Sequence, residues 1–202
     1  MSVPFKICGL TRAEDVAMAV ACGATAVGFV LWPKSPRSVP LATAAELAAG
    51  LPPFVAAIPV MVEPTIEEAR TAMEMLRTRH VQLHGERTPS VADLAAATVV
   101  RAASLDAAGD VPEEWTLLLD AADPVAHGGT GRTIDWASAS EIAVRRPTIL
   151  AGGLSPGNVG EAIGRVRPAA VDVASGVEIE PGRKSHEAIA AFAAAVRSGG
   201  RS

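Results

Sequence analysis

The sequence predicts an α/β fold in which strands and helices alternate around a closed (β/α)₈ barrel. Short, continuously apolar runs alternate with alanine-rich segments from one end of the chain to the other. Such runs are typical of parallel strands that are buried on both faces. There are roughly eight of these units, and a chain of 202 residues lies at the small end of the size range of this barrel. We therefore expect a single domain over residues 1–202 with a parallel eight-stranded sheet.

The predicted strands are short apolar runs bounded by turn-forming residues, and the predicted helices are the segments between them. Strands are expected at residues 3–8, 26–31, 54–61, 80–83, 98–102, 116–120, 148–151 and 170–174. Helices are expected at residues 11–21, 43–51, 65–76, 90–97, 104–114, 135–145, 157–165 and 185–197, of which 104–114 is the weakest. A doubly wound open sheet is the alternative, but the first strand–helix turn lacks the glycine pattern G-x-G-x-x-G.

Local signals define several element ends. Thr11 is placed to cap the first helix with its hydroxyl group. Glu67 and Glu68 fall in the first turn of the third helix, where the helix dipole favours carboxylates. Residues 32–38 contain two prolines and are too rich in proline for regular structure. We expect that segment to be a loop that carries the positive charge of Arg37.

Charge and composition argue against two kinds of partner. The chain has 18 basic and 22 acidic residues, a formal net charge of −4 and no basic run, which argues against nucleic acid binding. No uninterrupted apolar segment approaches the ~20 residues that a bilayer requires, and the first residues lack a charged leader followed by a long apolar stretch. We therefore expect a soluble, cytoplasmic protein with no membrane partner.

The only cysteines, Cys8 and Cys22, are predicted to lie at opposite ends of the first helix. A helix of about ten residues spans roughly 15 Å, which exceeds the ~7 Å limit between the Cα atoms of a disulfide. Both thiols are therefore expected to be free. Two cysteines without a matching histidine cluster also give no spacing typical of a metal site.

Polar residues end several predicted strands, which is where the active site of a (β/α)₈ barrel lies. These residues are Cys8, Gln82 with His84, and Asp120, together with Arg37 in the loop after the second strand. Each has a common structural alternative, such as a small core residue for the cysteine or a helix cap for the aspartate. Their regular placement favours a shared site. Cys8 also lies near the expected start of a helix, where a thiolate would be favoured.

Glycine-rich turns follow the seventh and eighth predicted strands. Gly152 and Gly153 occupy the first turn, and Ser175 and Gly176 occupy the second. Glycines let backbone amides approach an anion closely, and the loops at these two places often bind a substrate phosphate in barrel enzymes. The sequence therefore predicts a phosphate site here, with ordinary ligand-free turns as the alternative.

The alternation of side chains along strands predicts one buried ion pair. If Cys8 points into the barrel mouth, Lys6 points inward below it. Asp172, in the last strand, is expected to share that orientation, and the first and last strands are neighbours in a closed barrel. We expect Lys6 and Asp172 to form an ion pair beneath the thiol.

Several motifs together resemble the phosphoribosylanthranilate isomerase family of tryptophan biosynthesis. The resemblance spans the whole chain, and the order and spacing of the motifs are specific. They are Lys6-Ile7-Cys8-Gly9-Leu10-Thr11, Gly28-Phe29-Val30 with Ser35-Pro36-Arg37, Val81-Gln82-Leu83-His84-Gly85, Leu119-Asp120 with Gly128-Gly129-Thr130-Gly131 and Asp135-Trp136, Leu150-Ala151-Gly152-Gly153-Leu154 with Asn158-Val159, and Val171-Asp172-Val173 with Ser175-Gly176-Val177-Glu178.

The resemblance implies an isomerase that converts N-(5-phosphoribosyl)anthranilate to 1-(o-carboxyphenylamino)-1-deoxyribulose 5-phosphate by an Amadori rearrangement without cofactor or metal. By matched position, it implies that Cys8 is the general base, Asp120 the general acid and Arg37 the partner of the anthranilate carboxylate. The glycine turns described above correspond to the phosphate site. Gln82, His84 and Gly129 are expected to contact the phosphoribosyl substrate as well.

Three other functions remain open from the sequence. The histidine-pathway isomerase performs the same rearrangement. That family, however, resembles one with an aspartate-based acid–base pair, in which an acidic residue stands where this chain has Cys8. A pentose-phosphate epimerase would need metal ligands, for which the four histidines show no obvious spacing. A barrel without catalytic activity could bind a sugar phosphate only. The sequence leaves both a monomer and a homodimer open.

Overall fold

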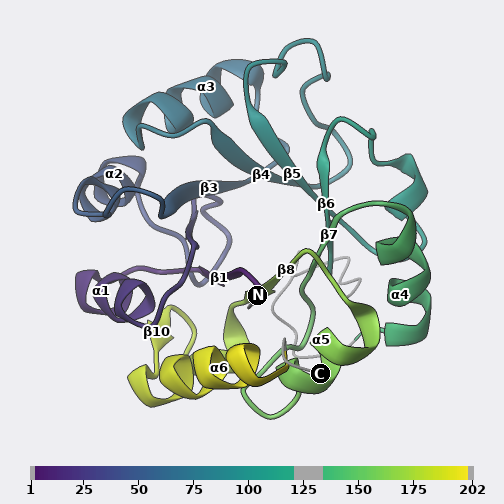
Figure 1. Cartoon of the computed structure of the whole chain (residues 1–202). Helices are drawn as coiled ribbons and strands as arrows, with labels where there is room; N and C mark the ends of the chain where they lie inside the picture. The colour runs from purple at the N-terminus through teal and green to yellow at the C-terminus, as the bar shows by residue number, and fades with distance from the viewer. Residues whose placement is uncertain (1–2, 121–133, 200–202) are drawn as a thin grey trace.

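The computed structural model of the chain describes residues 3–120 and 134–199. Eight parallel strands are hydrogen-bonded in sequence order, and the last pairs with the first, so the sheet closes into a barrel (Figure 1). The predicted fold is confirmed. The barrel strands are β1 (Phe5–Cys8), β2 (Ala26–Val30), β3 (Ala56–Val62), β4 (His80–His84), β5 (Thr98–Ala103), β6 (Thr116–Leu119), β7 (Thr148–Leu150) and β8 (Ala170–Val173).

Helices surround the barrel on its outer side (Figure 1). They are α1 (Ala13–Ala21), α2 (Leu41–Ala49), α3 (Ile66–Met75), α4 (Trp136–Arg145), α5 (Val159–Val166) and α6 (His186–Gly199). Short elements are the 3₁₀ helices η1 (Ala108–Asp110) and η2 (Ser175–Val177) and the antiparallel hairpin of β9 (Glu178–Glu180) and β10 (Arg183–Lys184). No helix in the described part of the chain is long and apolar enough to cross a membrane.

Two predicted helices are absent from the described residues. The segment 90–97 forms turns only, and Leu94 is its one fully buried residue. Short helices depend on burying an apolar face, which this segment lacks, so the prediction was wrong. The segment 104–114 contains only the three-residue η1. Gly109 and Pro112 disfavour a longer helix there.

Arginine side chains tie these two connections to the rest of the fold. Arg79 donates from Nε and Nη2 to the carbonyl oxygen of Ala96, at 3.0 and 2.8 Å. Arg146 donates to three carbonyl oxygens within residues 111–115, at 2.9, 2.9 and 2.6 Å. A guanidinium group has five N–H donors in a fixed plane, so one side chain can satisfy several carbonyls that a helix would have paired.

Two expectations at element ends are wrong. Thr11 does not cap α1, because the N-cap is Arg12, without a side-chain bond, and the Thr11 hydroxyl instead donates to the carbonyl of Gly182. The third strand begins at Ala56 rather than at Phe54, which is fully exposed and has a φ of 72°. That φ is outside the strand region.

The first helical turn of α3 agrees with the prediction. Thr65 is the N-cap, and its hydroxyl accepts from the backbone N–H of Glu68 while the Glu68 carboxylate accepts from the backbone N–H of Thr65. Glu67 lies in the same turn. This reciprocal capping box satisfies two backbone donors at the start of the helix.

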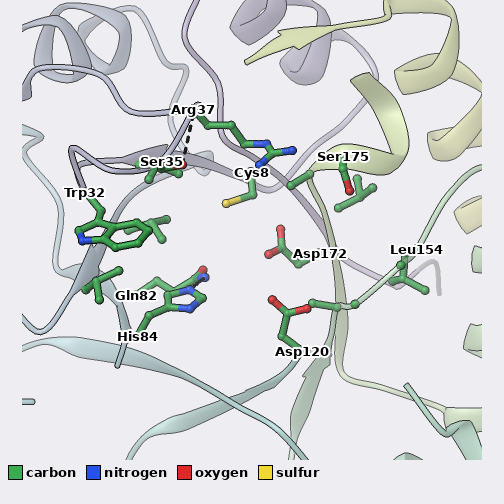
Figure 2. A pocket seen from close by; sticks show the side chains of 18 residues that line it. Cys8, Trp32, Ser35, Arg37, Gln82, His84, Asp120, Leu154, Asp172 and Ser175 are labelled. Carbon is green, nitrogen blue, oxygen red and sulfur yellow. Dashed lines mark hydrogen bonds between the residues drawn. The ribbon is translucent and has the colours of Figure 1, made fainter. Parts of the chain in front are cut away.

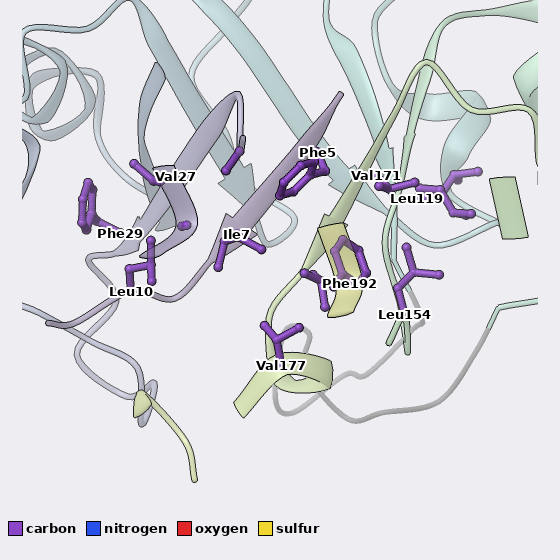
Figure 3. Close-up of a cluster of buried hydrophobic side chains, with 14 of the residues drawn as sticks. Phe5, Ile7, Leu10, Val27, Phe29, Leu119, Leu154, Val171, Val177 and Phe192 are labelled. Atoms are coloured by element: carbon purple, nitrogen blue, oxygen red, sulfur yellow. The ribbon is translucent and has the colours of Figure 1, made fainter. Parts of the chain in front are cut away.

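The alternation of side chains along β1 separates the core from the mouth of the barrel. Cys8 points into the mouth (Figure 2), and Phe5 and Ile7 lie in the apolar layer between barrel and helices (Figure 3). The ring of Phe5 meets that of Phe192 in α6 edge-on, with centroids 6.1 Å apart. A smaller apolar cluster consists of Val100, Ala102, Leu118 and Ala151. The larger layer therefore stabilises the wall, while the strand ends remain available for polar residues.

We expect Arg146→Met to lower the free energy of unfolding by about 2–3 kcal/mol, because buried carbonyls of the connection between β5 and β6 lose their donor. Arg145→Met is the matched control, since Arg145 is the exposed neighbour, and it should change stability by less than about 0.5 kcal/mol. Urea unfolding followed by circular dichroism measures both. Equal effects of the two substitutions would show that the Arg146 bonds do not stabilise this connection.

Candidate active site

A pocket opens at the carboxyl ends of the barrel strands (Figure 2). The space between its lining atoms, part of which is open solvent, is about 760 Å³. The polar and glycine residues of its lining are Cys8, Ser35, Arg37, Gln82, His84, Asp120, Gly152, Gly153, Asp172 and Ser175, with Trp32 and Leu154 among the apolar ones.

The pocket brings together most of the residues that the sequence nominated. Cys8 ends β1, and Asp120 directly follows β6 on the same pocket (Figure 2). Gly176 has a packing role, because a Cβ there would lie 1.9 Å from the carbonyl oxygen of Leu154. Only glycine therefore permits the contact between the turns after β7 and β8. Gly129 lies outside the described residues.

The predicted ion pair between Lys6 and Asp172 is confirmed. Lys6 Nζ lies 2.9 Å from Asp172 Oδ2, the two residues are direct partners in the β1–β8 register, and their side chains are 6% and 8% exposed. The pair also lies against the thiol. A Cβ on Gly28 would be 2.9 Å from both Cys8 Sγ and Lys6 Cε, so sulfur and ammonium stem meet at the same backbone position.

Burial raises the pKa of the Cys8 thiol above its ordinary value. The Lys6 ammonium lowers that pKa, the Asp172 carboxylate raises it, and burial has the largest effect. The expectation that a helix start would favour the thiolate is therefore wrong in its net effect: α1 begins only at Ala13, and the macrodipole acts over about one turn. Burial lowers the pKa of Lys6, but Asp172 and Cys8 together raise it by more than burial lowers it. The pKa of Lys6 is therefore raised overall, and Lys6 is a cation.

Two buried acceptors of this pocket have no hydrogen-bond partner among the described residues. They are Gln82 Oε1 and Asp172 Oδ1. Gln82 also places its Nε2 2.8 Å from Nε2 of His84. Because buried polar atoms are nearly always satisfied, such acceptors suit hydroxyl or N–H donors of a bound ligand.

Glu178 and Lys184 are functional candidates that the sequence reasoning missed. Arg37 donates from Nε to Oε1 and Oε2 of Glu178, at 2.9 and 3.2 Å, and from Nη2 to Oε2, at 2.8 Å. Lys184 Nζ lies 2.8 Å from Glu178 Oε1. Burial raises the pKa of Glu178, but Arg37 and Lys184 lower it more, so the carboxylate is ionised. Glu178 and Lys184 carry opposite charges on either side of the Pro181-Gly182 turn, and this pattern was a signal in the sequence for their contact.

The turn after β7 has a backbone suited to an anion. Gly152 and Gly153 have φ values of 72° and 67°, in the left-handed region that favours glycine. The side chain of Asn158 fixes the turn, because its Oδ1 accepts from the Ser155 N–H at 2.8 Å and its Nδ2 donates to the Gly153 carbonyl at 2.9 Å. The turn leads into the N-terminus of α5, whose partial positive charge attracts anions.

No group of three or more histidine, cysteine, aspartate or glutamate side chains is arranged to hold a metal ion within residues 3–120 and 134–199. Both cysteines are free thiols.

The fold and site define a class: a (β/α)₈-barrel enzyme with a thiol, a carboxyl group, an arginine and glycine-rich turns around one pocket. The chain also matches the model of the N-(5'-phosphoribosyl)anthranilate (PRA) isomerase family over residues 5–195. The chain belongs to this family.

Individual relatives agree with this assignment. The chain is 44% identical to the N-(5'-phosphoribosyl)anthranilate isomerase of Dechloromonas aromatica, covering 98% of this chain and 97% of the relative. It is 38% identical to the solved phosphoribosyl anthranilate isomerase of Thermotoga maritima, with a TM-score of 0.86 over 96% of this chain and 98% of the other. A further solved isomerase, in complex with reduced 1-(o-carboxyphenylamino)-1-deoxyribulose 5-phosphate, is 35% identical, with a TM-score of 0.83 over 98% and 99% of the two chains.

We expect Lys6→Met to lower the free energy of unfolding by about 3–5 kcal/mol, because it leaves the buried Asp172 carboxylate unpaired. The double substitution Lys6→Met with Asp172→Leu removes both charges and should recover most of that loss. Urea unfolding of the single and double variants gives the comparison. A loss below about 1 kcal/mol in Lys6→Met would contradict the buried pair.

The same pair should tune the thiol in opposite directions. Lys6→Met removes a nearby cation and raises the pKa of Cys8, whereas Asp172→Asn removes a nearby anion and lowers it. The pH dependence of alkylation by iodoacetamide, measured in a Cys22→Ser background, reports this pKa. Shifts of the same sign in both variants would show that the two charges do not act on the sulfur.

Proposed function

We propose that this protein converts N-(5'-phosphoribosyl)anthranilate to 1-(o-carboxyphenylamino)-1-deoxyribulose 5-phosphate in tryptophan biosynthesis, with Cys8 as general base and Asp120 as general acid. Family membership supports the reaction. The observation that supports the roles is that one pocket is lined by both a thiol and a carboxyl group, which come from separate strand ends. Because the family is biosynthetic, we expect this enzyme to act in the cytoplasm.

In the first step, Asp120 donates a proton to the ring oxygen of the ribose. The bond between C1 and the ring oxygen then breaks, and the anthranilate nitrogen shares its lone pair to form an iminium group at C1. The positive charge on nitrogen makes the proton on C2 acidic. This step requires Asp120 to be protonated, whereas a free aspartate is mostly ionised at neutral pH.

In the second step, the Cys8 thiolate removes the C2 proton. The electron pair of that C–H bond forms the double bond between C1 and C2, and the iminium nitrogen is neutralised. The resulting enolamine relaxes to the ketone. Burial makes the thiolate a minor form of Cys8 at neutral pH, and the adjacent Lys6 ammonium stabilises it. The substrate nitrogen is the electron sink, so the reaction needs no cofactor.

Binding is divided among the other pocket residues. Arg37 pairs with the anthranilate carboxylate, because guanidinium groups bind carboxylates in a planar, two-point geometry. The turns at Gly152-Gly153 and Ser175-Gly176 bind the phosphate with backbone amides. Gln82 and His84 face the sugar, where the unpaired Gln82 Oε1 suits a ribose hydroxyl. These roles favour the tryptophan-pathway substrate over the histidine-pathway amine.

We expect Cys8→Ser and Asp120→Asn each to lower kcat by about 10²–10⁴-fold, because each removes one positioned proton transfer. The assay follows the fall in phosphoribosylanthranilate fluorescence, run with a metal chelator present. Cys22→Ser is the matched control and should keep its kcat, since Cys22 lies outside the pocket at the end of α1. Wild-type kcat in either Cys8→Ser or Asp120→Asn would remove that residue from the mechanism.

A further inference from the structure

Arg37 is hydrogen-bonded to Glu178 in the β9–β10 hairpin, which is not part of the pocket lining. We propose that Glu178 is a positioning residue, which fixes the guanidinium of Arg37 for the anthranilate carboxylate, and that Lys184 anchors Glu178 in turn. The inference rests on the proposed role of Arg37 and goes beyond it, because it assigns substrate selection to residues outside the pocket lining.

The contact between Arg37 and Glu178 orients the guanidinium. The carboxylate meets the edge formed by Nε and Nη2 through three hydrogen bonds of 2.8 to 3.2 Å. This side-on arrangement fixes the plane of the group and leaves its Nη1 end directed away from Glu178. Arg37 lines the pocket, and its side chain is 13% exposed (Figure 2). The remaining N–H donors can therefore serve a ligand.

Lys184 holds the carboxylate in place. Its Nζ donates to Glu178 Oε1 at 2.8 Å and to the carbonyl of Ala174 at 3.0 Å, and its side chain is 0% exposed. The Glu178 side chain is 4% exposed, so both partners of this ion pair are buried. The three charges sum to +1 with Arg37 included. The corner therefore keeps one uncompensated positive charge for an anionic group of the substrate.

The hairpin is also fixed to the segment after β1 and lies beside the loop that carries Arg37. The Gly182 carbonyl accepts from the Thr11 hydroxyl, and the Gly182 N–H donates to Glu178 Oε1 at 3.3 Å. A Cβ on Gly182 would lie 3.3 Å from the carbonyl oxygen of Pro36, directly beside Arg37. The Lys184 backbone N–H donates to the buried carboxylate of Asp15 at 3.2 Å. These hydrogen bonds hold the β9–β10 hairpin against the segment after β1, and Gly182 lies beside the loop that carries Arg37.

This arrangement stabilises binding by ordering Arg37 before the substrate arrives. A free arginine side chain loses rotamer entropy when it binds a carboxylate, and a preorganised one loses less. The advantage applies only to ligands that carry the carboxylate. Loss of the Glu178 contact should therefore reduce selectivity for the anthranilate carboxylate more than overall affinity for the sugar phosphate.

The test separates orientation from charge. The double variant Glu178→Gln with Lys184→Met removes one negative and one positive charge, so the net charge of the corner stays at +1. The ligands are reduced 1-(o-carboxyphenylamino)-1-deoxyribulose 5-phosphate and its phenylamino counterpart without the carboxylate, and calorimetry measures both dissociation constants. We expect about tenfold weaker binding of the carboxylated ligand and a change within about twofold for the other.

Controls make the outcomes distinct. Glu180→Gln alters an exposed ion pair of the same hairpin and should leave both dissociation constants unchanged. Wild-type preference for the carboxylated ligand in the double variant overturns the inference, as does equal weakening of both ligands. If the double variant does not fold, Glu178→Gln alone decides the matter. There the corner gains positive charge, so a fall in preference supports orientation, and an unchanged or increased preference overturns it.

Two further measurements separate this inference from the proposed function. If Arg37→Ala weakens the binding of both ligands equally, the proposed role of Arg37 in binding the carboxylate is overturned, and the inference with it. If Arg37→Ala weakens the binding of the carboxylated ligand only, and the double variant binds both ligands as the wild type does, the inference alone is overturned. Wild-type protein that does not consume phosphoribosylanthranilate overturns the proposed function.

Discussion

The pairing of the first strand with the last is the contact on which the rest of the structure depends. It closes the barrel, and it also brings Lys6 opposite Asp172 in register. Without closure, each would be an unpaired charge at an open sheet edge, and Cys8 would lack both the burial and the cation that set its protonation. The pairing that closes the barrel therefore also creates the buried, charged environment of the Cys8 thiol.

The buried charges near the mouth of the barrel are paired with charges of opposite sign. Asp172 compensates Lys6 on one side, and Glu178 lies between Arg37 and Lys184 on the other. Burying an uncompensated ion costs several kcal/mol, so a catalytic site with several ionised groups must arrange them in such a sequence. Arg37, Glu178 and Lys184 together carry one net positive charge beside the pocket.

The sequence predicted the barrel because its strands are buried on both faces and their apolar runs stand out without reference to other parts of the chain. It also predicted Lys6 and Asp172, because strand alternation and closure together fix which side chains meet. Helices at 90–97 and 104–114 were wrong, since alanine-rich composition alone does not show whether a face is buried. Arg37 was expected at the mouth, but its contact with Glu178 joins residues separated by 141 positions. No local pattern reports such a contact.

The separation of Lys6 from its partner has a consequence for synthesis of the chain on the ribosome. Lys6 emerges first, and Asp172 follows 166 positions later, which at elongation rates of about 5–20 residues per second corresponds to roughly 8 to 33 s. Throughout that interval the ammonium group remains solvated and the N-terminal strand has an unpaired edge. A nascent chain therefore cannot become active in stages, and early release from the ribosome would yield a fragment with an exposed strand, a ready substrate for chaperones and proteases.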